Sequence, residues 1–262
     1  LQTIIDQLTL KKSIGHIEII TTGITTLVIR QLKKLNEQDV NIWQQAEQTH
    51  QWQILIDNGE DIAPLSPDSP KPEGTLHYKI QQGIKLSFSP NDFIQVNEKV
   101  NDNMISKAIE WLDIKPNDVV LDLFCGLGNF SLPIAQKAEC IIGVEGVQDM
   151  VDRASFNAKQ NRLTNCQFYQ ANLNAPWLKN KWAKDTFTKA ILDPARGGAY
   201  EAVKQLIQLK MDTILYVSCD ASTLAADSKL LIESGYRMKK IMLMDMFSQT
   251  KHVETMVLFE RF

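Results

Sequence analysis

The sequence predicts an α/β fold, in which a small α+β domain precedes a doubly wound, Rossmann-like parallel sheet. From Asp118 onward, short apolar runs alternate with helix-like segments, as in parallel sheets with helical crossovers. A glycine-rich turn, Gly126–Gly128, directly follows the apolar run 119–124. The first 86 residues instead contain hairpin patterns. We therefore expect one domain at residues 1–86 and a second at residues 87–262.

Composition indicates an ordinary soluble globular protein. The chain has 262 residues, of which 44% are hydrophobic and 23% charged, with a net charge of −3. Bulk charge gives no support for nonspecific nucleic-acid binding. No apolar run approaches the ~18 residues of a membrane span, so we expect no membrane association. The four cysteines are far apart without a CxxC pair. We expect neither a metal site nor disulfides, and a cytoplasmic location.

The N-terminal domain is expected to form a small sheet with one helix. Its predicted strands are 16–20, 24–29 and 52–56, and a polar helix is expected at 31–48. Residues 64–72 are too rich in proline for a helix or a sheet interior and should form a loop. Strands at 76–80 and 84–88 should form a second hairpin around residues 81–83. Nothing here carries chemistry, so a recognition or scaffold role is expected.

The second domain should begin with a turn and a helix. Pro90 and Asn91 mark the turn, and a helix is expected at 98–112. The strands that follow are predicted at 119–124, 140–145, 166–170, 189–193, 213–218, 239–244 and 255–260. Helices are predicted at 129–137, 147–161, 199–209 and 221–234. Ligands of such a sheet bind outside the carboxyl ends of its strands.

The glycine turn after the first of these strands allows three interpretations. A dinucleotide fingerprint requires a third glycine, but Ser131 stands at that position. The pattern acidic-x-F-x-G-x-G-x-F, from Asp122 to Phe130, resembles the first motif of S-adenosylmethionine (SAM) methyltransferases. An ordinary strand–turn–helix is the third possibility. In the dinucleotide and SAM interpretations, the glycines let the backbone approach a ligand, and the following helix directs its free N–H groups at that ligand.

Polar residues follow the next strands at the same edge of the sheet. Glu145 lies about 20 positions after the glycine turn, where an acidic residue binds ribose hydroxyls in this architecture, or it is only a neighbour of a helix N-cap. Asn172 could contact the adenine end of a nucleotide or simply form a turn. Asp193 should face the site. It opens Asp193-Pro194-Ala195-Arg196, which lacks the aromatic residue of amino-methylating enzymes.

Cys219 is the cysteine best placed for catalysis. It lies at the carboxyl end of a predicted strand and just before a helix, and a helix N-terminus lowers the pKa of a thiol. A buried, inert cysteine is the alternative. Glu254 precedes the last strand, and by itself would be read as a solvated surface residue.

Five stretches together resemble RumA-type 23S rRNA (uracil-5-)-methyltransferases, within the RNA uracil-C5 methyltransferase family. They are Phe88–Asn97, Leu121–Phe130, Leu192–Arg196, Val217–Asp227 and Asp245–Glu254. The resemblance implies a SAM-methyltransferase sheet and SAM as the cofactor. It implies 23S rRNA as the partner, and no protein partner, so we expect a monomer. Pro194 is followed by Ala195 rather than by the second cysteine of cytosine-5 enzymes, which favours uracil.

The resemblance also implies a role for each residue that matches. Cys219 would be the nucleophile that adds to uracil C6, and Glu254 the base that removes the C5 proton. Phe93 would lie beside the target base, and Asp193 would help to hold it. The residues matching the SAM site are Gln95, Phe124, Asn129, Glu145, Asn172 and Asp193.

Several features depart from the family pattern. Ser218-Cys219-Asp220 replaces the usual Ser-Cys-Asn, so a charge at Asp220 could raise the pKa of the thiol. The family carries an N-terminal RNA-binding barrel and a four-cysteine iron–sulfur cluster, yet no cysteine precedes Cys125. We expect this chain to be a fragment without either. A tRNA uracil-5 enzyme and a noncatalytic SAM-fold RNA-binding module are the alternative functions.

Overall fold

The computed structural model describes residues 1–67, 69, 76–80, 83–90, 92–184, 186–250 and 252–262. The chain forms two compact units, Leu1–His77 and Tyr78–Phe262. The predicted boundary between residues 86 and 87 stays a prediction. Parts of three sequence-based expectations lie outside the described residues: residues 68 and 70–72 of the 64–72 loop, the turn at Gln81 and Gln82, and Asn91.

The first unit is a four-stranded sheet with two helices. Its elements are α1 (Gln2–Gln7), a 3₁₀ turn at Lys11–Ser13, β1 (Ile14–Thr21), β2 (Thr25–Gln31), α2 (Glu37–His50), β3 (Gln53–Asp57) and β4 (Ile62–Pro64). The strand order is β1-β2-β3-β4, and only the β2–β3 pair is parallel. Trp43 is fully buried and packs with Leu27, Ile29 and Ile54 in the core of this unit.

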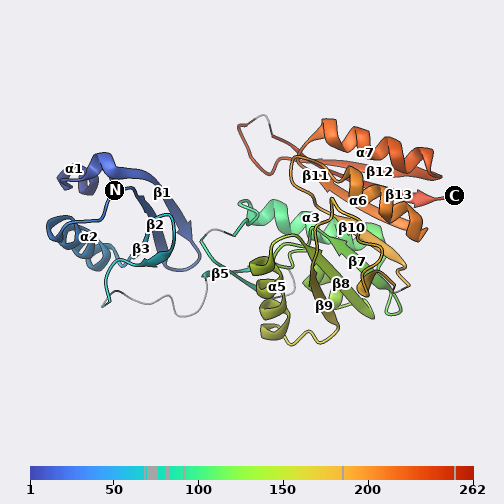
Figure 1. The fold of residues 1–262 in the computed structure, drawn as a ribbon, viewed down its shortest axis with the longest axis horizontal. Helices are drawn as coiled ribbons and strands as arrows, with labels where there is room; N and C mark the ends of the chain where they lie inside the picture. Colours follow the sequence, from blue (N-terminus) through green and yellow to red (C-terminus); the bar gives the residue numbers. More distant parts are fainter. Residues whose placement is uncertain (68, 70–75, 81–82, 91, 185, 251) are drawn as a thin grey trace. The chain divides into compact units, whose positions relative to one another are not determined.

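The second unit is built on a seven-stranded sheet with helices packed against it (Figure 1). Before the sheet come the hairpin β5 (Leu76–Ile80) and β6 (Ile84–Phe88), and then α3 (Glu98–Leu112). The sheet strands are β7 (Val119–Leu123), β8 (Cys140–Glu145), β9 (Cys166–Gln170), β10 (Lys189–Leu192), β11 (Thr213–Ser218), β12 (Tyr236–Met244) and β13 (Glu254–Arg261). The remaining helices are α4 (Ser131–Ala135), α5 (Gln148–Gln160), α6 (Tyr200–Leu206) and α7 (Ala221–Glu233), with short 3₁₀ turns at Trp182–Lys184 and Ile207–Leu209.

The order of the strands explains where a ligand can bind. The sheet runs β12-β13-β11-β10-β7-β8-β9, so the order reverses beside β7. The strands from β11 to β9 are parallel, which confirms the doubly wound prediction for this part. The expectation of a parallel sheet was wrong for β13, which is antiparallel to both β11 and β12.

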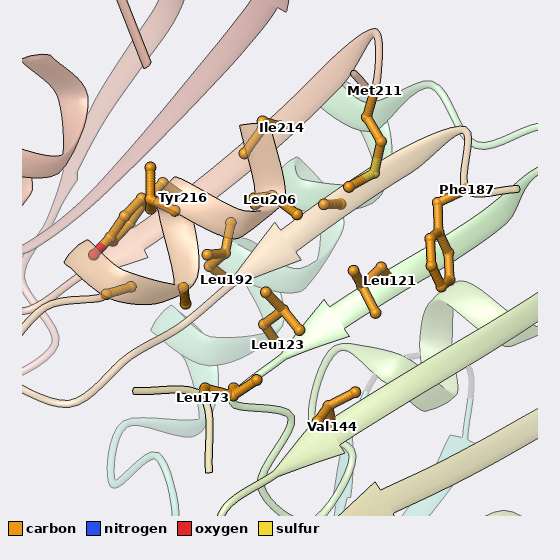
Figure 2. Close-up of a cluster of buried hydrophobic side chains, with 14 of the residues drawn as sticks. Leu121, Leu123, Val144, Leu173, Phe187, Leu192, Leu206, Met211, Ile214 and Tyr216 are labelled. Atoms are coloured by element: carbon orange, nitrogen blue, oxygen red, sulfur yellow. The ribbon is translucent and has the colours of Figure 1, made fainter. Parts of the chain in front are cut away.

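The sheet is covered by apolar side chains on both faces. Leu121, Leu123 and Leu192 point to one face and belong to a buried cluster with Leu206 of α6 (Figure 2). The cluster also includes residues of α7. The intervening residues, such as Val120 and Ile191, are fully buried too. A strand with both faces covered reads as a continuous apolar run, which is why β7 and β10, in the middle of the sheet, were predicted to within one residue.

Some elements differ from the prediction. Helix α1 was missed, because six residues without a side-chain cap give little periodic signal. Pro64, expected in a loop, ends the edge strand β4, where its missing N–H costs no ladder bond. Helix α2 begins at Glu37 rather than at residue 31, because the Asn36 side chain accepts the Asp39 N–H and caps it there. Among the described residues, no helix is long and apolar enough to span a membrane.

Candidate active site

One cavity of about 640 Å³ lies at the carboxyl ends of the parallel strands in the second unit. All the predicted site residues except Asn172 line it: Phe93, Gln95, Phe124, Asn129, Glu145, Asp193, Cys219 and Glu254. The Asn172 side chain accepts the N–H of Asn174 and is exposed, as in an ordinary turn. Its role in binding stays a prediction.

The start of the glycine loop is hydrogen-bonded to the neighbouring strand, β8. The backbone N–H of Phe124 donates to the Val144 carbonyl at 2.8 Å, and Phe124 adopts a φ of 63°. Gly126 and Gly128 also have positive φ angles, 53° and 98°, which glycine adopts without strain. The loop therefore turns sharply and its backbone forms part of the cavity wall.

Glu145 ties this loop to the segment that leads into α5. One carboxylate oxygen accepts the Gly126 N–H at 3.2 Å, and the other accepts the N–H groups of Gly146 and Val147. The carboxylate is thereby oriented at the mouth of the cavity. This is the position in which an acidic residue binds a ribose in this architecture.

The segment with Phe93 and Gln95 is fixed to α5. The Asp92 carboxylate accepts from the Arg153 guanidinium at 2.9 Å and from the Ser89 N–H at 2.6 Å. Just before it, the side chain of Asn157 pairs with both backbone groups of Ser87, as a neighbouring strand would. The segment is thus anchored on both sides of its turn, and Phe93 remains 66% exposed at the cavity.

The antiparallel direction of β13 brings Glu254 next to Cys219. Ser218, at the end of β11, pairs with Thr255 near the start of β13. Glu254 thus lies at the edge of the sheet where the parallel strands end, and it is 4% exposed. A parallel last strand would have carried it to the opposite edge. Burial raises the pKa of the Glu254 carboxyl above its ordinary value.

The Cys219 thiol is influenced by acidic and basic side chains of opposite effect. Burial raises the pKa of its thiol, and the carboxylates of Glu254 and Asp193 raise it further, whereas Arg196 lowers it. The position at a helix N-terminus suggested a lowered pKa, but the net shift is upward because burial and the two carboxylates dominate. Asp220 caps α7 through the N–H groups of Ser222 and Thr223, and these bonds lower its own pKa. It is not among the causes that raise the pKa of Cys219.

Asp193 lines the cavity and is half-buried, whereas Asp122, on β7, is fully buried and does not line it. Burial, the charge of Glu254 and that of Asp122 raise the pKa of Asp193 to about 8. Burial raises the pKa of Asp122 to about 7, although the Ser131 hydroxyl donates to it at 2.5 Å. A carboxyl group that is protonated near neutral pH can donate a hydrogen bond to a substrate oxygen.

Three other residues line the cavity, although the sequence indicated no role for them: Arg196, Phe247 and His252. The Arg196 guanidinium lies 3.3 Å from Nε2 of His252, whose ring meets Phe247 edge-on. All three stood within stretches that resemble the family. Their proximity could not be read from the sequence, because 56 positions separate Arg196 from His252.

Comparison with known families agrees with this geometry. The tRNA (uracil-5-)-methyltransferase family matches residues 3–262. The chain belongs to this family. It is 49% identical, over 99% of its length, to the 23S rRNA (uracil(1939)-C(5))-methyltransferase RlmD of Colwellia psychrerythraea, and 44% identical over its whole length to that of Aliivibrio salmonicida. The chain spans 58% of the length of each of these relatives.

Solved structures share the fold. The tRNA (uracil-54, C5)-methyltransferase of Pyrococcus abyssi, in complex with S-adenosyl-L-homocysteine, superposes with a TM-score of 0.71 over 93% of this chain and 59% of that one, at 21% identity. TYW2 of M. jannaschii, in complex with AdoMet, gives a TM-score of 0.57 over 94% of this chain and all of that one, at 16% identity. The second unit thus has the Rossmann-like fold of SAM-dependent methyltransferases.

Proposed function

We propose that this chain is the catalytic part of a SAM-dependent methyltransferase that modifies C5 of a uridine in 23S rRNA. The observation that carries the proposal is the juxtaposition of Cys219 and Glu254 at one cavity, beside the glycine loop and Glu145. The relatives named RlmD support 23S rRNA as the substrate. We further propose that the protein acts as a monomer in the cytoplasm, and that residues 1–86 contribute to RNA recognition.

The cavity residues fit SAM. The Oε1 atom of Gln95 is buried without a hydrogen-bond partner among the described residues, although Gln95 lines the cavity. A bound ligand with a donor group would satisfy it. Glu145 would accept from the ribose hydroxyls, Phe124 would pack against the ligand, and Asn129 and Asp193 would complete the site. SAM supplies an electrophilic methyl group when it is bound.

The proposed chemistry needs both the thiol and the carboxylate. Uracil C5 is a weak nucleophile, so the Cys219 thiolate first bonds to C6, and the π electron pair of the C5–C6 double bond moves to C5 and O4. C5 then takes the methyl group. Glu254 removes the C5 proton, the double bond forms again, and the bond between sulfur and C6 breaks. The elevated pKa of Glu254 strengthens it as a base.

The target base must leave its stack to reach Cys219. Unstacking costs roughly a few kcal/mol, and less at a single-stranded or bulged site. Phe93 is exposed at the cavity and can stack on the extruded base. Asp193, held protonated near neutral pH, can donate a hydrogen bond to a uracil oxygen.

Covalent trapping tests this function. The protein is mixed with SAM and a 23S rRNA fragment that carries 5-fluorouridine, and a denaturant-stable adduct is sought by mass. Fluorine at C5 cannot leave as a proton, so the protein should remain bonded to the methylated RNA. Cys219→Ala should abolish the adduct, whereas Cys166→Ala, which removes a thiol that does not line the cavity, should retain it.

The other outcomes identify the alternatives. An adduct with tRNA but not with 23S rRNA would make the chain a tRNA enzyme. SAM binding without an adduct on either RNA would support a noncatalytic RNA-binding module. The Glu254→Gln variant should accumulate an adduct even on RNA without fluorine, and normal turnover by that variant would remove Glu254 from the mechanism.

A further inference from the structure

The helix that follows Cys219 also holds a second loop of the active site. Asp227, on the second turn of α7, is only 1% exposed. Its Oδ2 atom accepts the backbone N–H of Ala199 at 2.8 Å and the hydroxyl of Tyr216 at 2.6 Å. Ala199 ends the loop 194–199, which carries Arg196. One carboxylate therefore connects the nucleophile's helix, strand β11 and this loop.

Two further contacts press the same loop against α7. The Thr223 hydroxyl lies 3.4 Å from the Arg196 carbonyl oxygen, to which it donates. Gly198 has a φ of 74°, and a Cβ atom there would lie 2.8 Å from Cβ of Thr223 and 3.1 Å from Oδ2 of Asp227. The loop fits against the helix only because Gly198 has no side chain.

The contacts of Asp227 are too specific for a core-filling residue. A buried carboxylate loses its hydration, and the two donors that reach Oδ2, an amide and a phenol, are both neutral. Tyr216 lies in the core cluster of the sheet (Figure 2), so its hydroxyl holds the carboxylate from a rigid strand. An apolar side chain would fill this space but would leave the Ala199 N–H without an acceptor.

We propose that Asp227 is a positioning residue, which fixes the loop 194–199 so that Arg196 faces Cys219. Arg196 lines the same cavity as Cys219 and favours its thiolate, against the carboxylates of Glu254 and Asp193. Asp220 follows Cys219 in the sequence, but its carboxylate accepts hydrogen bonds from N–H groups at the N-terminus of α7. Loss of the anchor at Ala199 would let Arg196 move away and leave Cys219 without the positive charge that favours its thiolate.

The test is the pH profile of Cys219 alkylation by iodoacetamide, followed on the Cys219 peptide by mass spectrometry. Asp227→Ala should shift the profile upward by about one pH unit, which lowers the rate at neutral pH about tenfold. Arg196→Ala should give a similar shift, and the double variant should add nothing further, because both changes remove the same interaction. Asp227→Asn should resemble the wild type, since its amide oxygen can accept both hydrogen bonds.

Tyr216→Phe separates positioning from stability. It removes one hydrogen bond to Asp227 and should lower the unfolding midpoint, but the Ala199 anchor remains and the pH profile should not move. If Asp227→Ala does not fold, Gly198→Ala displaces the loop from the other side and should give the same upward shift. An unchanged profile in Gly198→Ala or in folded Asp227→Ala, or shifts that add in the double variant, would overturn the proposal.

The inference rests on the proposed role of Cys219 as the nucleophile, but its first readout needs neither RNA nor SAM. Failure of the RNA adduct with a shifted alkylation profile would count against the proposed function alone. A normal adduct yield in Asp227→Ala, with an unshifted profile, would count against the positioning role alone. The two ideas can therefore fail separately.

Discussion

Asn101 and Asn129 hydrogen-bond each other through their side-chain amides, with Nδ2 to Oδ1 distances of 2.9 Å in both directions. Asn101 lies on α3 and is 1% exposed, whereas Asn129 follows the glycine loop and lines the cavity. The pair sets the orientation of the Asn129 amide, so that its second N–H and its remaining lone pair can serve a ligand. An interior residue thus controls a residue at the proposed cofactor site.

We expect Asn101→Ala to lower both stability and SAM affinity. The free energy of unfolding should fall by about 1–3 kcal/mol, because Asn129 loses both of its hydrogen bonds to Asn101. The measurements are urea unfolding and calorimetric titration with SAM. Asn165→Ala is the matched control, since Asn165 binds two carbonyls at the end of α4 and does not line the cavity. It should lose stability and keep its SAM affinity; equal affinity in both variants would contradict the role of Asn101.

Asp122 should make stability depend on pH in an unusual direction. Its pKa in the fold is about 7 against an ordinary value of 3.8, so the folded state binds the proton more tightly than the unfolded state. The stabilisation is complete below about pH 4 and is lost as the pH rises towards 7. In Asp122→Asn this loss is absent, and the free energy of unfolding relative to the wild type should rise between pH 4 and 7.

Asp118→Asn provides a control of opposite sign. Lys189 donates to the Asp118 carboxylate at 2.6 Å, and such bonds hold the pKa of Asp118 below its ordinary value. Its contribution is present above about pH 4 and is lost only as the pH falls below that. The difference between Asp118→Asn and the wild type should therefore be constant from pH 5 to 7. A similarly flat difference for Asp122→Asn, in urea titrations at each pH, would contradict the elevated pKa.

The sequence predicted the strand ends well, because a strand covered on both faces shows as an apolar run and its ligands lie at its carboxyl end. Glu145, Asp193 and Cys219 could therefore be placed on one side of the sheet. The position of Glu254 could not, because apolar periodicity does not reveal that β13 runs antiparallel to β11. The resemblance to the family supplied its role. The sign of the pKa shift at Cys219 also needed coordinates, because it depends on carboxylates from two other strands.

Gly143, in the middle of β8, accommodates an aromatic ring from the next strand. Its partner across the β8–β9 pair is Phe168, and a Cβ atom on Gly143 would lie 2.6 Å from Cε1 of that ring. The same Cβ would lie 3.0 Å from the sulfur of Cys125 in the glycine loop. The absent side chain thus lets the ring and the loop pack on β8 together.

We expect Gly143→Ala to lower the free energy of unfolding by about 1–3 kcal/mol, because the ring and the loop must both move. SAM affinity should fall as well, since Glu145 is two residues further along the strand. Gly197→Ala is the control: a Cβ there meets no atom within 4 Å, and stability should change by no more than about 0.5 kcal/mol. Adding Phe168→Leu should restore part of the loss, since the smaller side chain leaves room for the new methyl group. If urea unfolding shows no recovery in the double variant, the clash with Phe168 is not the cause.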